Sequence, residues 1–136
     1  MAQDTTKQTI DCDALPPAIG PYSHAVRVGA TLYVSGTIPV DPESGEIVVG
    51  GISAETERVI GNLRILLESL GIGLGDVVKT TVFLTDMSDF SAMNEVYARH
   101  FADCRPARST VAVRALPKGV SVEIDCIAVV PERAIA

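Results

Sequence analysis

One segment near the end of the chain is apolar on both faces of the strand that it predicts. Over residues 120–130, successive side chains alternate between two faces. One face holds Val120, Val122, Ile124, Cys126, Ala128 and Val130, and the other holds Ser121, Glu123, Asp125, Ile127 and Val129. Residues 77–84 are similarly two-sided, because Val82, Phe83 and Leu84 follow one another. A fold built on these strands must cover both faces of its sheet.

Short β-branched and aromatic runs predict the other strands. Residues 22–28 and 31–35 flank Gly29-Ala30 and predict an antiparallel pair. Turn-forming residues crowd positions 41–46, and a short return strand is expected at 47–49. A strand from about 108 to 115 leads through the turn Pro117-Lys118-Gly119 into the last strand, which suggests a hairpin.

Apolar residues at every third or fourth position predict two amphipathic helices. The first begins at Ser53, the expected N-terminal cap, and ends at Gly71, which can adopt a left-handed conformation. The second is capped by Ser88. Its apolar face comprises Phe90, Met93, Val96, Tyr97 and Phe101.

The predicted order is ββ(β)αβαββ, an α+β domain with two helices on one face of a mostly antiparallel sheet. The 136 residues form a single domain, 1–136, in which residues 1–18 are an ordered N-terminal arm. Two helices leave the second sheet face uncovered, and no further segment remains to cover it. We therefore expect a homo-oligomer joined through its sheet faces.

Charge and composition narrow the range of ligands and partners. The net charge of −6 disfavours binding to nucleic acid or to an anionic membrane surface, and six aromatic residues offer little for base stacking. No apolar run approaches the roughly 20 residues of a membrane span. Three widely spaced cysteines suggest neither disulfides nor a zinc site. These features predict a cytoplasmic protein with a small ligand.

The positions of Arg108 and Glu123 suggest a binding site for a small carboxylate. If Leu116 lies opposite Gly119 in the hairpin, Arg108 and Glu123 share a face, although a slip of one residue would separate them. An arginine can hold a carboxylate through two parallel hydrogen bonds, and a partly desolvated glutamate can deprotonate water. The alternative is a structural Arg–Glu ion pair at an oligomer contact, which the spacing alone favours.

Five separated segments resemble the signature of the Rid family, the reactive intermediate deaminases, also called the YjgF or endoribonuclease L-PSP family. They are Ala18-Ile19-Gly20-Pro21-Tyr22-Ser23, residues 34–39, residues 78–84, Asn94 before Tyr97, and Pro106-Ala107-Arg108-Ser109-Thr110. The resemblance implies a chorismate-mutase-like (ferredoxin-like ββαβαββ) fold and a homotrimer whose sheets form a central barrel. It also implies sites in clefts between subunits and hydrolysis of 2-imino acids, such as 2-iminopropanoate formed from 2-aminoacrylate, to 2-keto acids and ammonia without cofactor or metal.

The resemblance also assigns roles to individual residues. It implies that Arg108 holds the substrate carboxylate and that Glu123 positions the attacking water. Tyr22 of a neighbouring subunit would line the cleft. Ser35, Gly36 and Asn94 would shape it or supply polar contacts. Thr110, which would also contact substrate, stands where many deaminating members carry cysteine, which leaves the substrate range open.

Two other functions are compatible with the same fold. One is a non-catalytic module in which Arg108 captures a keto acid without turnover. The other is a ribonuclease that inhibits translation, as the older family name implies. The acidic charge and the few aromatic residues argue against an RNA-binding track.

Overall fold

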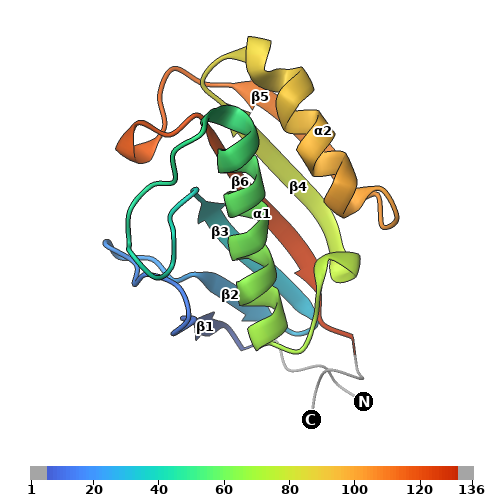
Figure 1. The fold of residues 1–136 in the computed structure, drawn as a ribbon. Coiled ribbons are helices and arrows are strands. Elements are labelled where there is room, and N and C mark those ends of the chain that lie inside the picture. Colours follow the sequence, from blue (N-terminus) through green and yellow to red (C-terminus); the bar gives the residue numbers. More distant parts are fainter. Residues whose placement is uncertain (1–5, 132–136) are drawn as a thin grey trace.

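Six strands form one sheet, and both α-helices pack against the same face of it (Figure 1). The computed structural model describes residues 6–131. The strands are β1 (Gln8–Ile10), β2 (Ala25–Val28), β3 (Thr31–Thr37), β4 (Val77–Leu84), β5 (Ala107–Ala112) and β6 (Val122–Val129), and the helices are α1 (Gly51–Ser69) and α2 (Phe90–Phe101). The strand order is β1-β2-β3-β6-β4-β5, with only the β4–β5 pair parallel among the described pairs. The predicted α+β class is confirmed.

The predicted hairpin between the last two strands is wrong. Strand β6 lies between β3 and β4, antiparallel to both, whereas β5 pairs in parallel with the far side of β4. The apolar, alternating β6 takes a central position, where both of its edges are paired. Strand β5 carries several exposed side chains and forms the edge. The connection runs past the end of β4, where the Val113 N–H donates to the Leu84 carbonyl and the Thr85 N–H donates to the Ser121 carbonyl.

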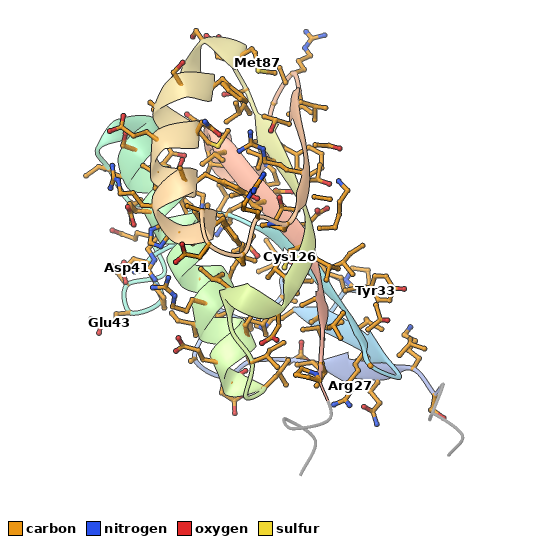
Figure 2. All side chains as sticks on the ribbon, turned by 90° about the vertical axis from the view of Figure 1, so that its right-hand side faces the viewer. Arg27, Tyr33, Asp41, Glu43, Met87 and Cys126 are labelled. Carbon is orange, nitrogen blue, oxygen red and sulfur yellow. The ribbon has the colours of Figure 1, made fainter. Side chains whose placement is uncertain are left out.

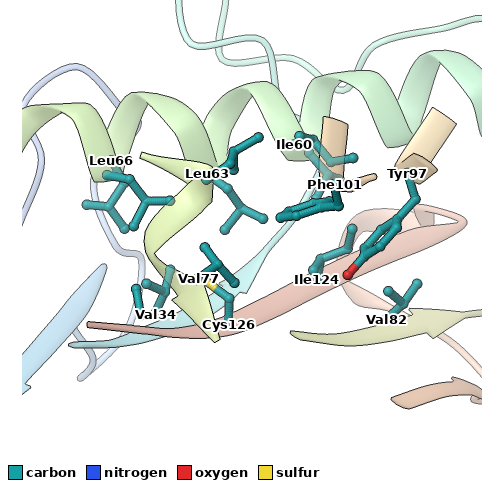
Figure 3. Close-up of a cluster of buried hydrophobic side chains, with 14 of the residues drawn as sticks. Val34, Ile60, Leu63, Leu66, Val77, Val82, Tyr97, Phe101, Ile124 and Cys126 are labelled. Carbon is teal, nitrogen blue, oxygen red and sulfur yellow. The ribbon is translucent and has the colours of Figure 1, made fainter. Parts of the chain in front are cut away.

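The core lies between the two helices and the sheet. From α1, Ile60, Leu63 and Leu66 point toward the sheet, where Ile124 and Cys126 of β6 meet them (Figure 3). From α2, the stacked rings of Tyr97 and Phe101 complete the cluster. The buried helix residues follow the predicted spacing of three to four positions, so this part of the prediction holds.

The predicted helix caps are partly wrong. The N-cap of helix α1 is Gly50, three residues before the predicted Ser53, so Ser53 lies inside the first turn. At its end, Gly71 adopts a positive φ of 77° as predicted, and the N–H groups of Gly71 and Ile72 close a Schellman motif on the Glu68 and Leu67 carbonyls.

Local hydrogen bonding also changes the start of α2 and the region before α1. The cap of α2 is Asp89, because Asp86 accepts the Ser88 N–H and forms a short 3-10 turn first. The predicted return strand at 47–49 is also wrong, since Ile47 forms only an isolated β-bridge, with Val40.

The sheet face away from the helices carries exposed apolar side chains and is uncovered in the protomer. Tyr33, Val111 and Val129 are 40–50% exposed there, and Figure 2 shows Tyr33 projecting from this side. The expectation of one uncovered face is therefore confirmed. In the N-terminal arm, β1 pairs with β2, whereas residues 1–5 of the predicted arm lie outside the described residues. Within residues 6–131 neither helix has the length and apolarity required to cross a bilayer.

Candidate functional site

Arg108 lies on the helix-facing side of the sheet, where α2 holds its guanidinium. Its register partner on β4 is the buried Thr80. The guanidinium stacks 4.7 Å from the ring centroid of Tyr97 and 5.5 Å from that of Phe90, a cation–π arrangement. One of its N–H groups donates to the Asn94 side-chain carbonyl at 2.7 Å. Within residues 6–131 its other N–H groups make no hydrogen bond to protein, so they can bind a ligand.

Thr110 follows two residues after Arg108 and faces the same side. Its hydroxyl oxygen is buried and has no hydrogen-bond partner within the described part of the chain. A buried hydroxyl without a partner costs free energy, so such a group is unusual in a folded protein. We call Asn94, Arg108 and Thr110 the arginine group.

Glu123 lies on the opposite, uncovered face of the sheet. Phe83 of β4 is its register partner. Gly36 packs so closely against it that a methyl group added at Gly36 would overlap the Glu123 carboxylate and force that side chain to move. The preceding Ser35 donates its hydroxyl to the Ser23 carbonyl at 2.6 Å.

Tyr22, Ser35 and Gly36 line a single cavity, and the Tyr22 side of that cavity opens to solvent. Gly36 therefore connects the cavity lining to Glu123. We call Tyr22, Ser35, Gly36 and Glu123 the glutamate group.

The predicted shared face of Arg108 and Glu123 is therefore wrong. Because β5 pairs with β4 and not with β6, the register sends Arg108 toward α2 and Glu123 to the uncovered side. Neither of the two ion pairs found within residues 6–131 involves them, since both join Glu57 to α2. The structural ion pair proposed as the alternative is absent from the protomer as well. The site residues predicted from the sequence thus fall into two groups, with Arg108 and Glu123 on opposite faces of the sheet.

The local environment makes Glu123 a stronger base than an ordinary glutamate. Partial burial raises the pKa of its carboxyl, and the charge of Asp125, two residues away on the same face, raises that pKa further. A carboxylate with a raised pKa accepts a proton from water more readily.

The model of the endoribonuclease L-PSP family matches residues 12–130, nearly the whole chain. This chain belongs to the endoribonuclease L-PSP family. A RutC family protein of Pyrococcus abyssi is 50% identical over 122 residues, which cover 90% of this chain and 96% of that protein. The 2-iminobutanoate/2-iminopropanoate deaminase of Mus musculus is 46% identical over 90% of this chain and 91% of its own length.

Solved structures agree with the fold of this L-PSP family member. A putative endoribonuclease of Thermotoga maritima is 56% identical and superposes with a TM-score of 0.87, covering 91% of this chain and 98% of that one. The fold described above is therefore a known one, that of the Rid family, which is also called the endoribonuclease L-PSP family.

Sequence reasoning missed two residues of this L-PSP protein that line the cavity, His24 and Lys118. The His24 ring accepts the Cys12 N–H at 2.9 Å, and its other nitrogen lies 2.8 Å from the Pro16 carbonyl, so it fastens the N-terminal arm to the cavity wall. Lys118 was predicted only as part of a turn. No pattern in the sequence pointed to either role, because both depend on contacts between distant segments. Within residues 6–131, no group of three or more histidine, cysteine or acidic side chains could hold a metal ion.

Proposed function

We propose that this protein hydrolyses 2-imino acids to 2-keto acids and ammonia at sites built from two protomers. The observation that carries the proposal is the division of the site residues between two faces. The arginine group can bind a carboxylate and the glutamate group can activate water, but the sheet separates them within one chain. They can act on one small molecule only where two copies meet. The deaminase name of the mouse relative supports this reaction.

The uncovered sheet face supports the assembly that such a site needs. Exposed Tyr33, Val111 and Val129 lie on the same face as Glu123, and covering them removes apolar surface from water. We propose a cyclic trimer with the sheets at its centre, in which each site takes its arginine group from one subunit and its glutamate group from the next. Light scattering should give about 43 kDa, three times the 14.3 kDa of one chain.

The proposed reaction uses the imine's own electrophilic carbon. Arg108 holds the carboxylate through two parallel N–H donors while Asn94 and the two aromatic rings fix the guanidinium. The Glu123 carboxylate accepts a proton from water as the water oxygen bonds to the imine carbon. Return of this proton to nitrogen gives a carbinolamine. Its hydroxyl proton then also passes to nitrogen as the carbon–nitrogen bond breaks and the carbonyl forms, so ammonia leaves and a keto acid remains.

A coupled assay tests this function. A dehydratase releases 2-aminoacrylate, which tautomerises to 2-iminopropanoate, and keto acid formation is followed with and without this protein. We expect the protein to accelerate keto acid formation above the spontaneous rate. Calorimetric binding of the keto acid without any acceleration would contradict the proposal and favour the non-catalytic binding module.

The pH dependence of the reaction should report the environment of Glu123. Because its pKa is raised, the reactive carboxylate is lost as the pH falls, and it is lost at a higher pH than for an ordinary glutamate. Asp125→Asn removes the neighbouring charge, so the acidic limb of the kcat/KM profile should move to lower pH. The exposed Asp86→Asn serves as the matched control and should leave the limb in place. An acidic limb that does not move in Asp125→Asn would contradict this assignment.

Thr110→Val should increase the stability of the protein while weakening its binding of substrate. Valine keeps the shape of the side chain and removes the buried hydroxyl without a partner, so the free energy of unfolding should rise by about 1 kcal/mol. If the hydroxyl contacts substrate, KM should increase roughly three- to tenfold for the loss of one neutral hydrogen bond. Denaturant unfolding and steady-state kinetics measure the two effects. A variant with unchanged KM would remove Thr110 from the binding residues.

A further inference from the structure

The uncovered face of the sheet carries charged side chains as well as apolar ones. On β4, the fully buried Thr80 and Val82 face the helices, so Lys79 lies on the opposite, uncovered face. On β6, Glu123 and Asp125 lie on that same face. A charged side chain on a surface that a second chain covers needs a partner or a part in the reaction. The reaction proposed above assigns a chemical step to Glu123 but none to Lys79 or Asp125.

Asp125 has no partner within the described part of the protomer. Its side chain is half-buried, and its register partner on β4 is Thr81. Within residues 6–131 its carboxylate makes no ion pair and no hydrogen bond. Glu123, two residues away on the same face, carries the same sign of charge. Covering an unpaired carboxylate costs free energy, so a second chain is favoured here only if it brings a cation to Asp125.

Lys79 is a cation on the same uncovered face. The cationic residues of the six described strands are Arg27, Lys79 and Arg108. Arg27 pairs with a fully buried residue of β3 and Arg108 stacks on α2, so both lie on the helix-facing side. The Lys79 ammonium donates to the Thr80 carbonyl at 3.0 Å and to the Ser109 hydroxyl at 3.2 Å. Both acceptors are neutral, so the positive charge is not balanced and a third N–H donor remains.

Within one chain, Lys79 and Asp125 do not pair. On the β4–β6 ladder Lys79 lies opposite Ile127 and Asp125 lies opposite Thr81, and neither ion pair found within residues 6–131 joins the two. The ammonium group instead turns toward β5, where it bonds to Ser109. It is therefore directed to the edge strand that carries the arginine group.

The strand register places both charges beside the residues of the proposed site. Lys79 pairs with Ala107, the residue before Arg108. Asp125 lies two residues along β6 from Glu123. Neighbouring strands are about 5 Å apart, and two residues span about 7 Å along a strand. When Arg108 of one chain approaches Glu123 of the next, both charges enter the same contact. The long, flexible lysine side chain can then reach Asp125.

We propose that Lys79 of one chain and Asp125 of the next form an ion pair, and that this pair selects the docking that completes the shared site. The inference rests on the proposed function and adds the contact that orients the two chains. A shifted docking would leave Asp125 without a cation or bring like charges together, and both outcomes disfavour that arrangement.

Charge reversal tests the pair. Lys79→Glu and Asp125→Lys each bring two like charges together, so the concentration at which half of the trimer dissociates should rise roughly tenfold or more. The double variant carries the pair in reverse order and should return to within roughly threefold of wild type. Sedimentation velocity over a dilution series measures dissociation, and kcat/KM at the lowest concentration should follow the fraction of trimer. Glu68→Lys reverses an exposed charge on α1 and should leave dissociation unchanged.

Neutral variants test the pair if a reversed chain does not fold. Lys79→Met and Asp125→Asn each leave one charge in the contact without its partner, so each should weaken the trimer. The double neutral variant should weaken it less than the two single effects combined. Asp125→Asn also leaves Lys79 of the next chain near Glu123, so the shift of the acidic limb predicted above keeps its direction.

The inference and the proposed function fail in different ways. Effects of the two positions that simply add, or single variants that dissociate at the same concentrations as wild type, would overturn the inference. Failure of the proposed function would instead leave a wild-type trimer that does not accelerate keto acid formation, although the charge reversals would still report the pair.

Discussion

Arg108→Ala should lower kcat/KM for imine hydrolysis by roughly two to four orders of magnitude, since two charged hydrogen bonds of about 1.5–3 kcal/mol each are lost. The guanidinium is already oriented by Asn94 and by the rings of Phe90 and Tyr97, so little ordering is needed when substrate binds. Initial-rate kinetics on the wild type and the variant give the ratio.

Arg108→Lys is the matched control for charge. Lysine keeps one positive charge but cannot form the two parallel donors, so the variant should fall between wild type and Arg108→Ala. Unchanged trimer mass and circular dichroism exclude a folding defect. An Arg108→Ala trimer within threefold of wild-type kcat/KM would remove this residue from substrate binding.

Glu123→Gln should lower kcat by roughly 100- to 10,000-fold, the usual contribution of a positioned general base. Glutamine has nearly the same shape and still accepts hydrogen bonds, but it cannot take a proton from water. The KM should therefore change little. The variant also removes a half-buried charge next to Asp125, so its stability should not decrease.

The pH profile distinguishes a base from a structural group. The residual activity of Glu123→Gln should lack the acidic limb seen in the wild type. A variant that retains wild-type kcat, or one that retains the limb at the same pH, would assign proton transfer to another group.

The helices and the core could be predicted from the sequence because their signals are local. The apolar spacing in α1 and α2 directly sets which side chains are buried, and Gly71 ends its helix as its conformational freedom predicts. The residues that cap the N-termini of the two helices were harder to predict. Gly50 precedes α1 with a φ of 127°, and Asp86 diverts the chain into a short turn before α2, so neither serine was needed as a cap.

The order of the strands could not be predicted in the same way. Pro117-Lys118-Gly119 predicted a tight hairpin turn, although residues 113–121 carry the chain past β4 to a different position in the sheet. The residues of β5 do not specify a parallel partner. That pairing follows from the position of β6, which occupies the place beside β4 that the predicted hairpin gave to β5. The two-sided pattern of β6 did correctly predict that one sheet face would remain uncovered.

The grouping of the site residues could not be predicted either, because it also depends on the order of the strands. The sequence picked out Arg108 and Glu123 individually, but the face on which each side chain lies follows from strand order. That order separates them in the protomer and turns a single predicted cluster into two groups. His24 and Lys118 carried no signal, since their importance comes from contacts with the arm and the cavity.

Complementation between two inactive variants tests the shared site most directly. Arg108→Ala and Glu123→Gln chains are co-expressed in equal amounts with different tags, and trimers that carry both tags are isolated as one pool alongside each pure variant. If each site joins Arg108 of one chain to Glu123 of the next, random mixing should restore about a quarter of wild-type activity, and trimers containing both chains should show about a third. Activity no higher than that of the pure variants, in trimers shown to contain both chains, would contradict a site built between protomers.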